Sequence, residues 1–144
     1  MKILMVCLGN ICRSPLAEGI MRHLAEKENL NWEIASAGTG NWHIGQSPDH
    51  RSIAAARSLG YDISQQRAQQ FNQAMFAKYD LILVMDRNNL TDVQSLAKTN
   101  EERQKVKLFL NEAEVTDPYW DNNLFTPVCK QVEERCKEII KQLS

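Results

Sequence analysis

The amino-acid sequence predicts an α/β fold: a single-domain, three-layer sandwich of residues 1–144, in which helices flank both faces of a four-stranded parallel sheet. Short, almost uninterrupted apolar segments alternate with longer segments whose apolar residues recur at helical spacing, as in buried parallel strands and their crossover helices. A length of 144 residues with 43% apolar content can bury one core, and no linker rich in Gly, Ser or Pro interrupts the chain.

The four expected strands are residues 3–6, 31–36, 79–85 and 105–110. A helix should follow each strand. Ser14-Pro15 is typical of a helix start, and apolar residues at helical spacing continue this first helix to about residue 28. Ser47-Pro48-Asp49 opens a second helix that stops near Gly60, and the C-terminal helix starts near Thr126-Pro127.

Right-handed crossovers in a parallel sheet place the ligand site at the carboxyl ends of the strands. Four polar or reactive residues fall near or just beyond the predicted strand ends, namely Cys7, Ser36, Asp86 and Asp117. Asp86 is expected mainly as a helix N-cap, and an indirect role near the first loop stays open. The order of elements therefore predicts where the site lies.

A cysteine and an arginine bracket five residues directly after the first strand, in the order Cys7-Leu8-Gly9-Asn10-Ile11-Cys12-Arg13-Ser14. At such a strand-to-helix turn, backbone N–H groups and the positive end of the helix dipole stabilise an anion. Cys7 is therefore expected to be a thiolate, and Arg13 can offer a planar fork of donors to two phosphoryl oxygens. The pattern predicts a phosphate-binding loop that carries a nucleophile.

The remaining residue types of this loop agree with that interpretation. Gly9 and Asn10 tolerate the positive φ that a tight loop needs. Ser14 can hydrogen-bond the sulfur of Cys7 and can also cap the following helix. The alternative is that Cys7 is a small buried residue that ends a strand, but the combined spacing, glycine, arginine and hydroxyl favour the site.

A general acid for the leaving group is expected in a loop far along the chain. Asp117-Pro118-Tyr119 lies between the last predicted strand and the C-terminal helix, which places it at a strand end. In isolation, Asp-Pro is an ordinary turn signal. With Cys7 and Arg13 already placed, Asp117 is the candidate acid.

The sequence resembles the low-molecular-weight protein tyrosine phosphatases over essentially its whole length. The resemblance rests on residues 6–15, on Ser36-Ala37-Gly38-Thr39 and on Asp117-Pro118-Tyr119. It implies hydrolysis of phosphotyrosine through a phosphocysteine intermediate, without metal or cofactor, by Cys7 as nucleophile, Arg13 as phosphate clamp and Asp117 as general acid and then base. The residues that it implies for phosphate binding are Leu8, Gly9, Asn10, Ile11, Cys12 and Ser14, with Asn10, Ser14 and Ser36 as the network that supports the loop.

The resemblance also implies the walls of the site. Trp42, Tyr119 and Trp120 match aromatic residues around a slot for an aromatic ring, although Trp120 could equally cover the hydrophobic core. Ile11 is the residue of tyrosine-directed members, whereas phosphoarginine phosphatases carry threonine there. Gln66 and Gln69 stand where many members carry histidine and arginine, and whether the phosphate loop is supported in the same way stays open.

The four cysteines lack the spacing of a zinc site, and no metal is expected. By resemblance, Cys7 and Cys12 could form a reversible disulfide. Cys129 and Cys136 are expected on one buried face of the last helix. Two other functions stay open: a thioredoxin-coupled arsenate reductase of the same fold that relays a disulfide through such a pair, and a phosphate or phosphopeptide binding module.

A formal net charge of −1 with dispersed lysines and arginines argues against a nucleic-acid surface. No segment reaches the length of a membrane span, and a working thiolate needs a reducing compartment, so the cytoplasm is expected. The expected partner is a tyrosine-phosphorylated protein. By the resemblance, a bacterial tyrosine kinase of the kind that controls polysaccharide export is one possible partner. A monomer and a weak dimer both stay open.

Overall fold

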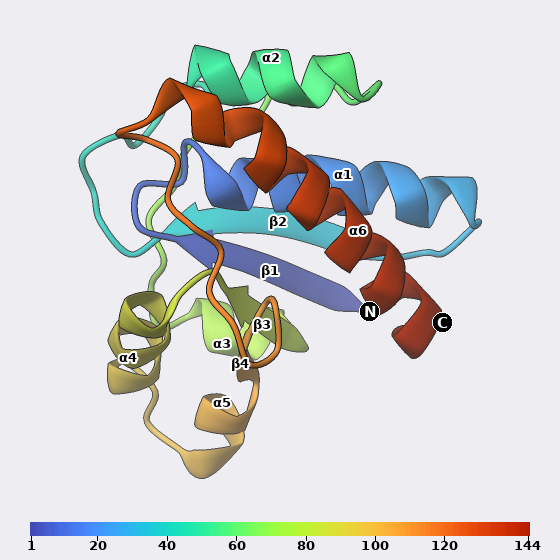
Figure 1. The fold of residues 1–144 in the computed structure, drawn as a ribbon. Helices are drawn as coiled ribbons and strands as arrows, with labels where there is room; N and C mark the ends of the chain where they lie inside the picture. The colour runs from blue at the N-terminus through green and yellow to red at the C-terminus, as the bar shows by residue number, and fades with distance from the viewer.

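The computed structural model describes residues 1–144, and its centre is a sheet of four parallel strands in the order β2-β1-β3-β4 (Figure 1). The strands are β1 (Lys2–Cys7), β2 (Glu33–Gly38), β3 (Leu81–Val84) and β4 (Val106–Leu108). The predicted four-stranded parallel sheet is confirmed. The predicted third and fourth strands are longer than the observed ones, although the backbone pairing continues beyond β3, where Asp80 N–H donates to Lys2 O and Met85 N–H to Val6 O.

Side chains of the central strands alternate between two hydrophobic cores because successive residues of a strand point to opposite faces of the sheet. In β1, Ile3 and Met5 belong to the larger core, whereas Leu4 and Val6 belong to the smaller one. All four are fully buried. This double burial explains the nearly continuous apolar sequence of β1.

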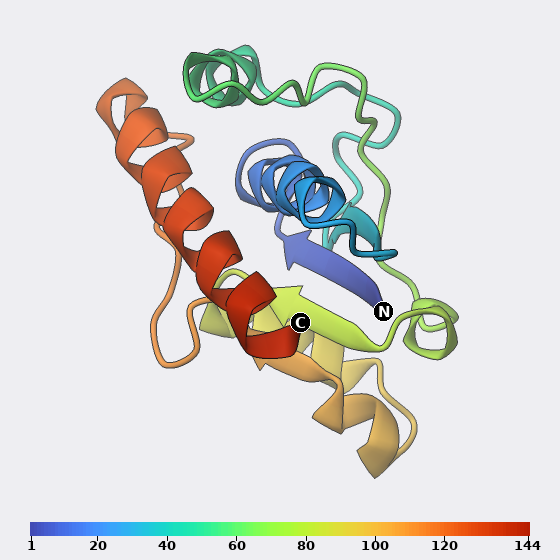
Figure 2. The same cartoon turned by 90° about the vertical axis from the view of Figure 1, so that its right-hand side faces the viewer.

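Helices cover both faces of the sheet, as predicted (Figure 1, Figure 2). The larger core lies under α1 (Arg13–Lys27) and α6 (Phe125–Leu143), and α2 (His50–Ser58) packs outside them on the same side. The opposite face packs against α3 (Met75–Lys78) and α4 (Arg87–Ser95), followed by α5 (Asn100–Gln104). A short 3-10 helix, η1 (Asn122–Leu124), precedes α6. None of these helices combines the length and the apolar character that a membrane span requires.

The helix starts confirm the predicted cap at Asp86, define the start of the second helix and correct the role of Ser14. Asp86 caps α4, because its Oδ1 accepts the N–H of Asn89 at 2.8 Å. The second helix begins at His50 rather than at Ser47, because Asp49 is the N-cap and accepts the N–H of Arg51. Ser14 is not a cap: Cys12 holds the N-cap position of α1, without a side-chain bond.

The strand order explains where the functional loops gather. After β2 the chain crosses to the other side of β1, so that α1 and α4 leave neighbouring strands on opposite faces of the sheet. In open α/β sheets, the crevice at such a reversal lies at the carboxyl ends of the strands and holds the ligand. The loop from Leu8 to Cys12 begins at this point, directly after β1.

Candidate active site

The loop between β1 and α1 wraps around the sulfur of Cys7. Asn10 adopts a left-handed conformation with φ of 57°, and its N–H donates to Cys7 Sγ at 3.3 Å. The hydroxyl of Ser14 lies 3.0 Å from the same sulfur. Cys7 is only 2% exposed. The sulfur therefore sits among hydrogen-bond donors at the N-terminus of α1, an arrangement that stabilises a negative charge.

A network of side chains supports the loop from behind. Asn10 Nδ2 donates to Ser14 Oγ at 2.8 Å and to Ser36 Oγ at 2.9 Å. The structure thus brings Asn10, Ser14 and Ser36 together. Asn10 and Ser14 were also expected to bind phosphate, but neither lines the cavity in front of Cys7. Their side chains hydrogen-bond to each other and hold the loop in shape, so they are not free to bind phosphate.

Gln69 completes this network, and Gln66 lies beside it. The backbone N–H of Gln69 donates to Asn10 Oδ1 at 3.0 Å, and its side chain donates to Ser36 O at 2.9 Å. Gln66 Nε2 donates to Pro15 O at 3.0 Å, whereas its Oε1 is buried without a partner. A neutral glutamine therefore supports the loop at position 69, whereas Gln66 contacts the first turn of α1.

The end of β2 presses against the phosphate loop. A Cβ added to Gly38 would lie 2.8 Å from the carbonyl oxygen of Leu8, which is closer than real Cβ atoms approach. Directly after it, Thr39 N–H donates to Cys7 O, and Gly40 N–H donates to Leu8 O. Glycine is thus needed at position 38 because of a close backbone approach. This contact gives a physical reason for the glycine in Ser36-Ala37-Gly38-Thr39.

Arg13 is a buried residue at the start of α1 that three oxygen atoms hold in place. Its Nη1 donates to Asp86 Oδ2 at 2.7 Å and to Val115 O at 3.0 Å, and its Nη2 lies 3.9 Å from Asp117 Oδ2. Burial by itself lowers the pKa of this guanidinium, but the negative charge at Cys7 and the bond to Asp86 raise it overall. Arg13 therefore stays charged beside the sulfur. The sequence left an indirect role for Asp86 open, and the ion pair supplies it.

The two cysteines of the loop differ in their surroundings. Burial raises the pKa of Cys12 to about 12, and the negative charges of Asp49 and Cys7 add to this effect. Cys12 is thus a neutral thiol at neutral pH, without the donors that surround Cys7. The two side chains belong to the same turn, and neither forms a disulfide in the structure.

A cavity of about 280 Å³ opens in front of the Cys7 sulfur. Its lining joins residues that are far apart in the sequence: Cys7, Leu8, Gly9, Ile11, Cys12, Arg13, Trp42, His43, Asp117, Tyr119 and Trp120. All three predicted aromatic residues are among them. Trp120 is 87% exposed, so the expectation that it covers the hydrophobic core is wrong. His43 also lines the cavity, although no pattern in the sequence predicted it as a site residue.

Cys129 and Cys136 lie on the buried face of α6, as expected. Both are fully buried, and the Cys136 thiol donates to Ala17 O in α1. Burial raises the pKa of Cys129 to about 11, and it raises the pKa of Cys136 further. Both are neutral thiols packed in the core. No group of three or more His, Cys, Asp or Glu side chains is placed to hold a metal ion.

Comparison with known proteins agrees with this geometry. The family model described as "Low molecular weight phosphotyrosine protein phosphatase" matches residues 2–144. The low molecular weight protein-tyrosine-phosphatase YfkJ of Bacillus subtilis is 34% identical over 98% of this chain and 94% of its own.

Two solved structures are similar over nearly the whole fold. A protein tyrosine phosphatase from Entamoeba histolytica with Hepes in the active site has a TM-score of 0.93 and 32% identity, and covers 99% of this chain and 96% of its own. Wzb from Vibrio vulnificus in complex with benzylphosphonate has a TM-score of 0.89 and 32% identity, and covers 99% of this chain and 98% of its own. With the family model matching all but the first residue, this chain belongs to the low molecular weight phosphotyrosine protein phosphatases.

Proposed function

We propose that Cys7, Arg13 and Asp117 are the nucleophile, the phosphate-binding group and the general acid of this protein. As a member of its family, the protein is an enzyme that hydrolyses phosphotyrosine. The main support for these three roles is that all three side chains line one cavity with aromatic walls. A thiolate, a guanidinium and a carboxyl group around one space are what phosphoryl transfer to sulfur requires.

Substrate phosphate is held by the loop and by Arg13. The backbone N–H groups of the loop and the N-terminus of α1 offer donors to the phosphoryl oxygens. Arg13 contributes a forked donor that Asp86 and Val115 already hold in one orientation. Pre-organised donors of this kind stabilise the charge on the phosphoryl group without reorganising during the reaction.

In the first step, Cys7 Sγ attacks phosphorus and the bond to the phenolic oxygen breaks. The leaving oxygen takes the proton of Asp117, which lies at the mouth of the cavity, 3.9 Å from Arg13. The products are a phosphocysteine and the free phenol. General acid catalysis of this type contributes about 10²- to 10⁴-fold in rate.

In the second step, water attacks the phosphocysteine and releases inorganic phosphate. Asp117, now a carboxylate, accepts a proton from this water. The Cys7 sulfur departs as a thiolate, which the hydroxyl of Ser14 and the N–H of Asn10 stabilise through the contacts described above. The enzyme returns to its starting state with no other reactant than water.

The walls of the cavity favour an aromatic phosphate ester. Trp42, Tyr119 and Trp120 surround the mouth, and Tyr119 and Trp120 pack edge to face with ring centroids 4.9 Å apart. The related Wzb structure holds benzylphosphonate, which carries a phosphonate next to an aromatic ring. Ile11 lines the same cavity and adds an apolar surface. These features support phosphotyrosine over phosphoserine as the substrate.

The exposed rim supports a protein as the partner of this site. Leu8 and Trp42 are large apolar residues that stand exposed next to the cavity, where a polypeptide around the phosphotyrosine would contact them. The substrate is thus a tyrosine-phosphorylated protein, and a tyrosine kinase is one candidate. A reducing compartment such as the cytoplasm suits an enzyme whose four cysteines are free thiols.

The test compares hydrolysis of a phosphotyrosine peptide with that of phosphoserine and phosphoarginine substrates, without added metal. Wild type, Cys7→Ser and Asp117→Asn are assayed in parallel, with phosphate binding measured separately. We expect phosphotyrosine turnover that Cys7→Ser abolishes and that Asp117→Asn lowers by about 10²-fold or more, with little change in phosphate affinity. Unchanged turnover in Asp117→Asn would contradict its assignment as general acid.

Arsenate reduction is the competing reaction of this fold, and it is measured beside the phosphatase assay. It would require Cys129 and Cys136 to relay a disulfide, but both are fully buried neutral thiols in a long helix. A neutral buried thiol attacks a disulfide slowly because the thiolate is the reactive form. Arsenate reduction without phosphotyrosine turnover would overturn the phosphatase assignment.

A further inference from the structure

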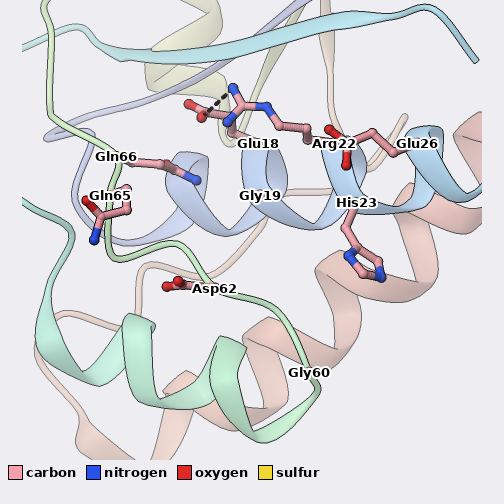
Figure 3. Close-up of a pocket in the computed structure, with 9 residues that line it drawn as sticks. All are labelled: Glu18, Gly19, Arg22, His23, Glu26, Gly60, Asp62, Gln65 and Gln66. Atoms are coloured by element: carbon pink, nitrogen blue, oxygen red, sulfur yellow. Dashed lines mark ion pairs between the residues drawn. The ribbon is translucent and has the colours of Figure 1, made fainter.

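A polar groove of about 540 Å³ lies beside α1, away from the residues that line the catalytic cavity (Figure 3). Figure 3 shows it between α1 and the segment that runs from Gly60 to Gln66. Glu18 and Arg22, one helical turn apart, form an ion pair there. The proposed mechanism uses neither residue.

Glu18 is a buried carboxylate with specific partners on both oxygens. It is 7% exposed, its Oε1 accepts the hydroxyl of Ser36 at 2.6 Å, and its Oε2 lies 2.9 Å from Arg22 Nη2. Arg22 also donates to Ile34 O in β2 at 2.6 Å. Burial raises the pKa of Glu18, while the bonds from Ser36 and Arg22 oppose that rise. The pair thereby links α1 to the strand that carries Ser36.

The hydrogen bond to Ser36 joins Glu18 to the catalytic loop. A carboxylate only accepts hydrogen bonds, so the single hydroxyl proton of Ser36 points to Glu18. The Ser36 oxygen is then free to accept one N–H of the Asn10 amide, and the other N–H goes to Ser14. With its oxygen used as an acceptor, Ser14 is left to donate its proton to Cys7 Sγ.

The direction of this chain is fixed at both ends. The Asn10 amide cannot be turned around, because its Oδ1 accepts the backbone N–H of Gln69. Glu18 supplies the acceptor at the other end, four hydrogen bonds from the sulfur. Without that acceptor, the buried hydroxyl of Ser36 would lose its hydrogen-bond partner, and Ser36 would hold the Asn10 amide less firmly.

We propose that Glu18, oriented by Arg22, is a positioning residue for Cys7 that acts through Ser36, Asn10 and Ser14. The inference rests on the proposed role of Cys7 as the nucleophile. Glu18 touches neither the cavity nor the sulfur, so it acts only by holding the donors that surround the thiolate. The competing explanation is that the Glu18–Arg22 pair merely supports α1 as an exposed pair at this helical spacing would.

The experiment is a double-mutant cycle between Glu18 and Ser36. The variants are Glu18→Ala, Ser36→Ala and the double variant, with Glu26→Gln as control, because Glu26 is an exposed carboxylate on the same groove. Two quantities are measured: kcat and KM for a phosphotyrosine peptide, and the rate of Cys7 alkylation by iodoacetate as a function of pH. The second readout reports on the sulfur and does not depend on turnover.

We expect Glu18→Ala to lower kcat about tenfold with little change in KM, the size expected when one hydrogen bond to a charged group is lost. The pH dependence of Cys7 alkylation should move to higher pH, since the thiolate is held less well. The double variant should be no worse than Ser36→Ala alone, because both changes interrupt the same chain. Glu26→Gln should behave as the wild type in both assays.

Three results would overturn the proposal: an unshifted alkylation profile in Glu18→Ala, losses in kcat that multiply in the double variant, or an equal shift in Glu26→Gln. If Glu18→Ala does not fold, Glu18→Gln replaces it, because glutamine keeps an acceptor for Ser36 but removes the charge. Glu18→Gln should shift the alkylation profile in the same direction by a smaller amount. A wild type that alkylates at Cys7 but does not hydrolyse phosphotyrosine would reject the proposed function alone.

Discussion

Replacing Asp86 with asparagine tests the pairing that holds Arg13 beside the nucleophile. Arg13 is 3% exposed and has only three oxygen partners close by, of which Asp86 Oδ2 at 2.7 Å is the nearest. Asparagine has the same shape as aspartate and is equally suited to the N-cap of α4. The Asp86→Asn variant therefore removes the negative charge while it keeps the helix cap.

The size of the effect follows from burial. Removing one partner of a fully buried ion pair destabilises a protein by about 3–5 kcal/mol. The side chain of Asp86 is 20% exposed, so solvent moderates this cost and we expect about 2 kcal/mol. For a chain of this length, that loss lowers Tm by about 6–8 °C. Asp86→Ala should cost about 1 kcal/mol more, because the N–H of Asn89 also loses its acceptor.

The assay is urea unfolding followed by circular dichroism, with Tm from a thermal scan. Asp92→Asn is the matched control, since Asp92 is an exposed aspartate of the same helix whose side chain makes no ion pair. The control should stay within about 0.5 kcal/mol of the wild type. An Asp86→Asn variant that is as stable as this control would refute the argument that the buried guanidinium depends on the Asp86 charge.

Three further predictions concern other parts of the molecule. Iodoacetamide at neutral pH should label Cys7 but not Cys129 or Cys136 in the folded protein, because burial raises the pKa of both α6 thiols; peptide mapping that finds Cys136 labelled without denaturant would contradict this. Trp120→Ala should raise KM for a phosphotyrosine peptide about threefold or more, because this exposed side chain lines the cavity. The free energy of unfolding should change by less than about 0.5 kcal/mol. A variant that loses stability while its KM stays unchanged would assign Trp120 to the core instead. Tyr61→Phe should destabilise the fold by about 1–2 kcal/mol, because the Tyr61 hydroxyl donates to Glu133 Oε2 at 2.6 Å. Burial also raises the pKa of Tyr61, so the wild type should lose stability as pH rises above the usual tyrosine range. A Tyr61→Phe variant that loses stability over the same alkaline range would show that Tyr61 does not cause this loss.

Local sequence patterns predicted the sheet and its main helices. The apolar run before Cys7 and the helical stripe after Ser14 each depend on neighbours within a few positions, so periodicity reveals them. The short helices α3 and α5 were missed, because four or five residues carry no measurable helical stripe. The role predicted for Ser14 was partly wrong, because its hydroxyl hydrogen-bonds to the Cys7 sulfur and to Asn10 and does not cap the helix.

The sequence by itself determined the nucleophile loop, because the cysteine, the arginine and the residues between them are neighbours along the chain and shape one turn. Only the tertiary structure decided what surrounds that loop. Asp86 pairs with Arg13 across 73 positions, Gln69 orients Asn10 across 59, and Glu18 reaches Ser36 on the adjacent strand. Such contacts leave no local periodicity, because they exist only when the order of strands in the sheet has brought distant segments to one edge.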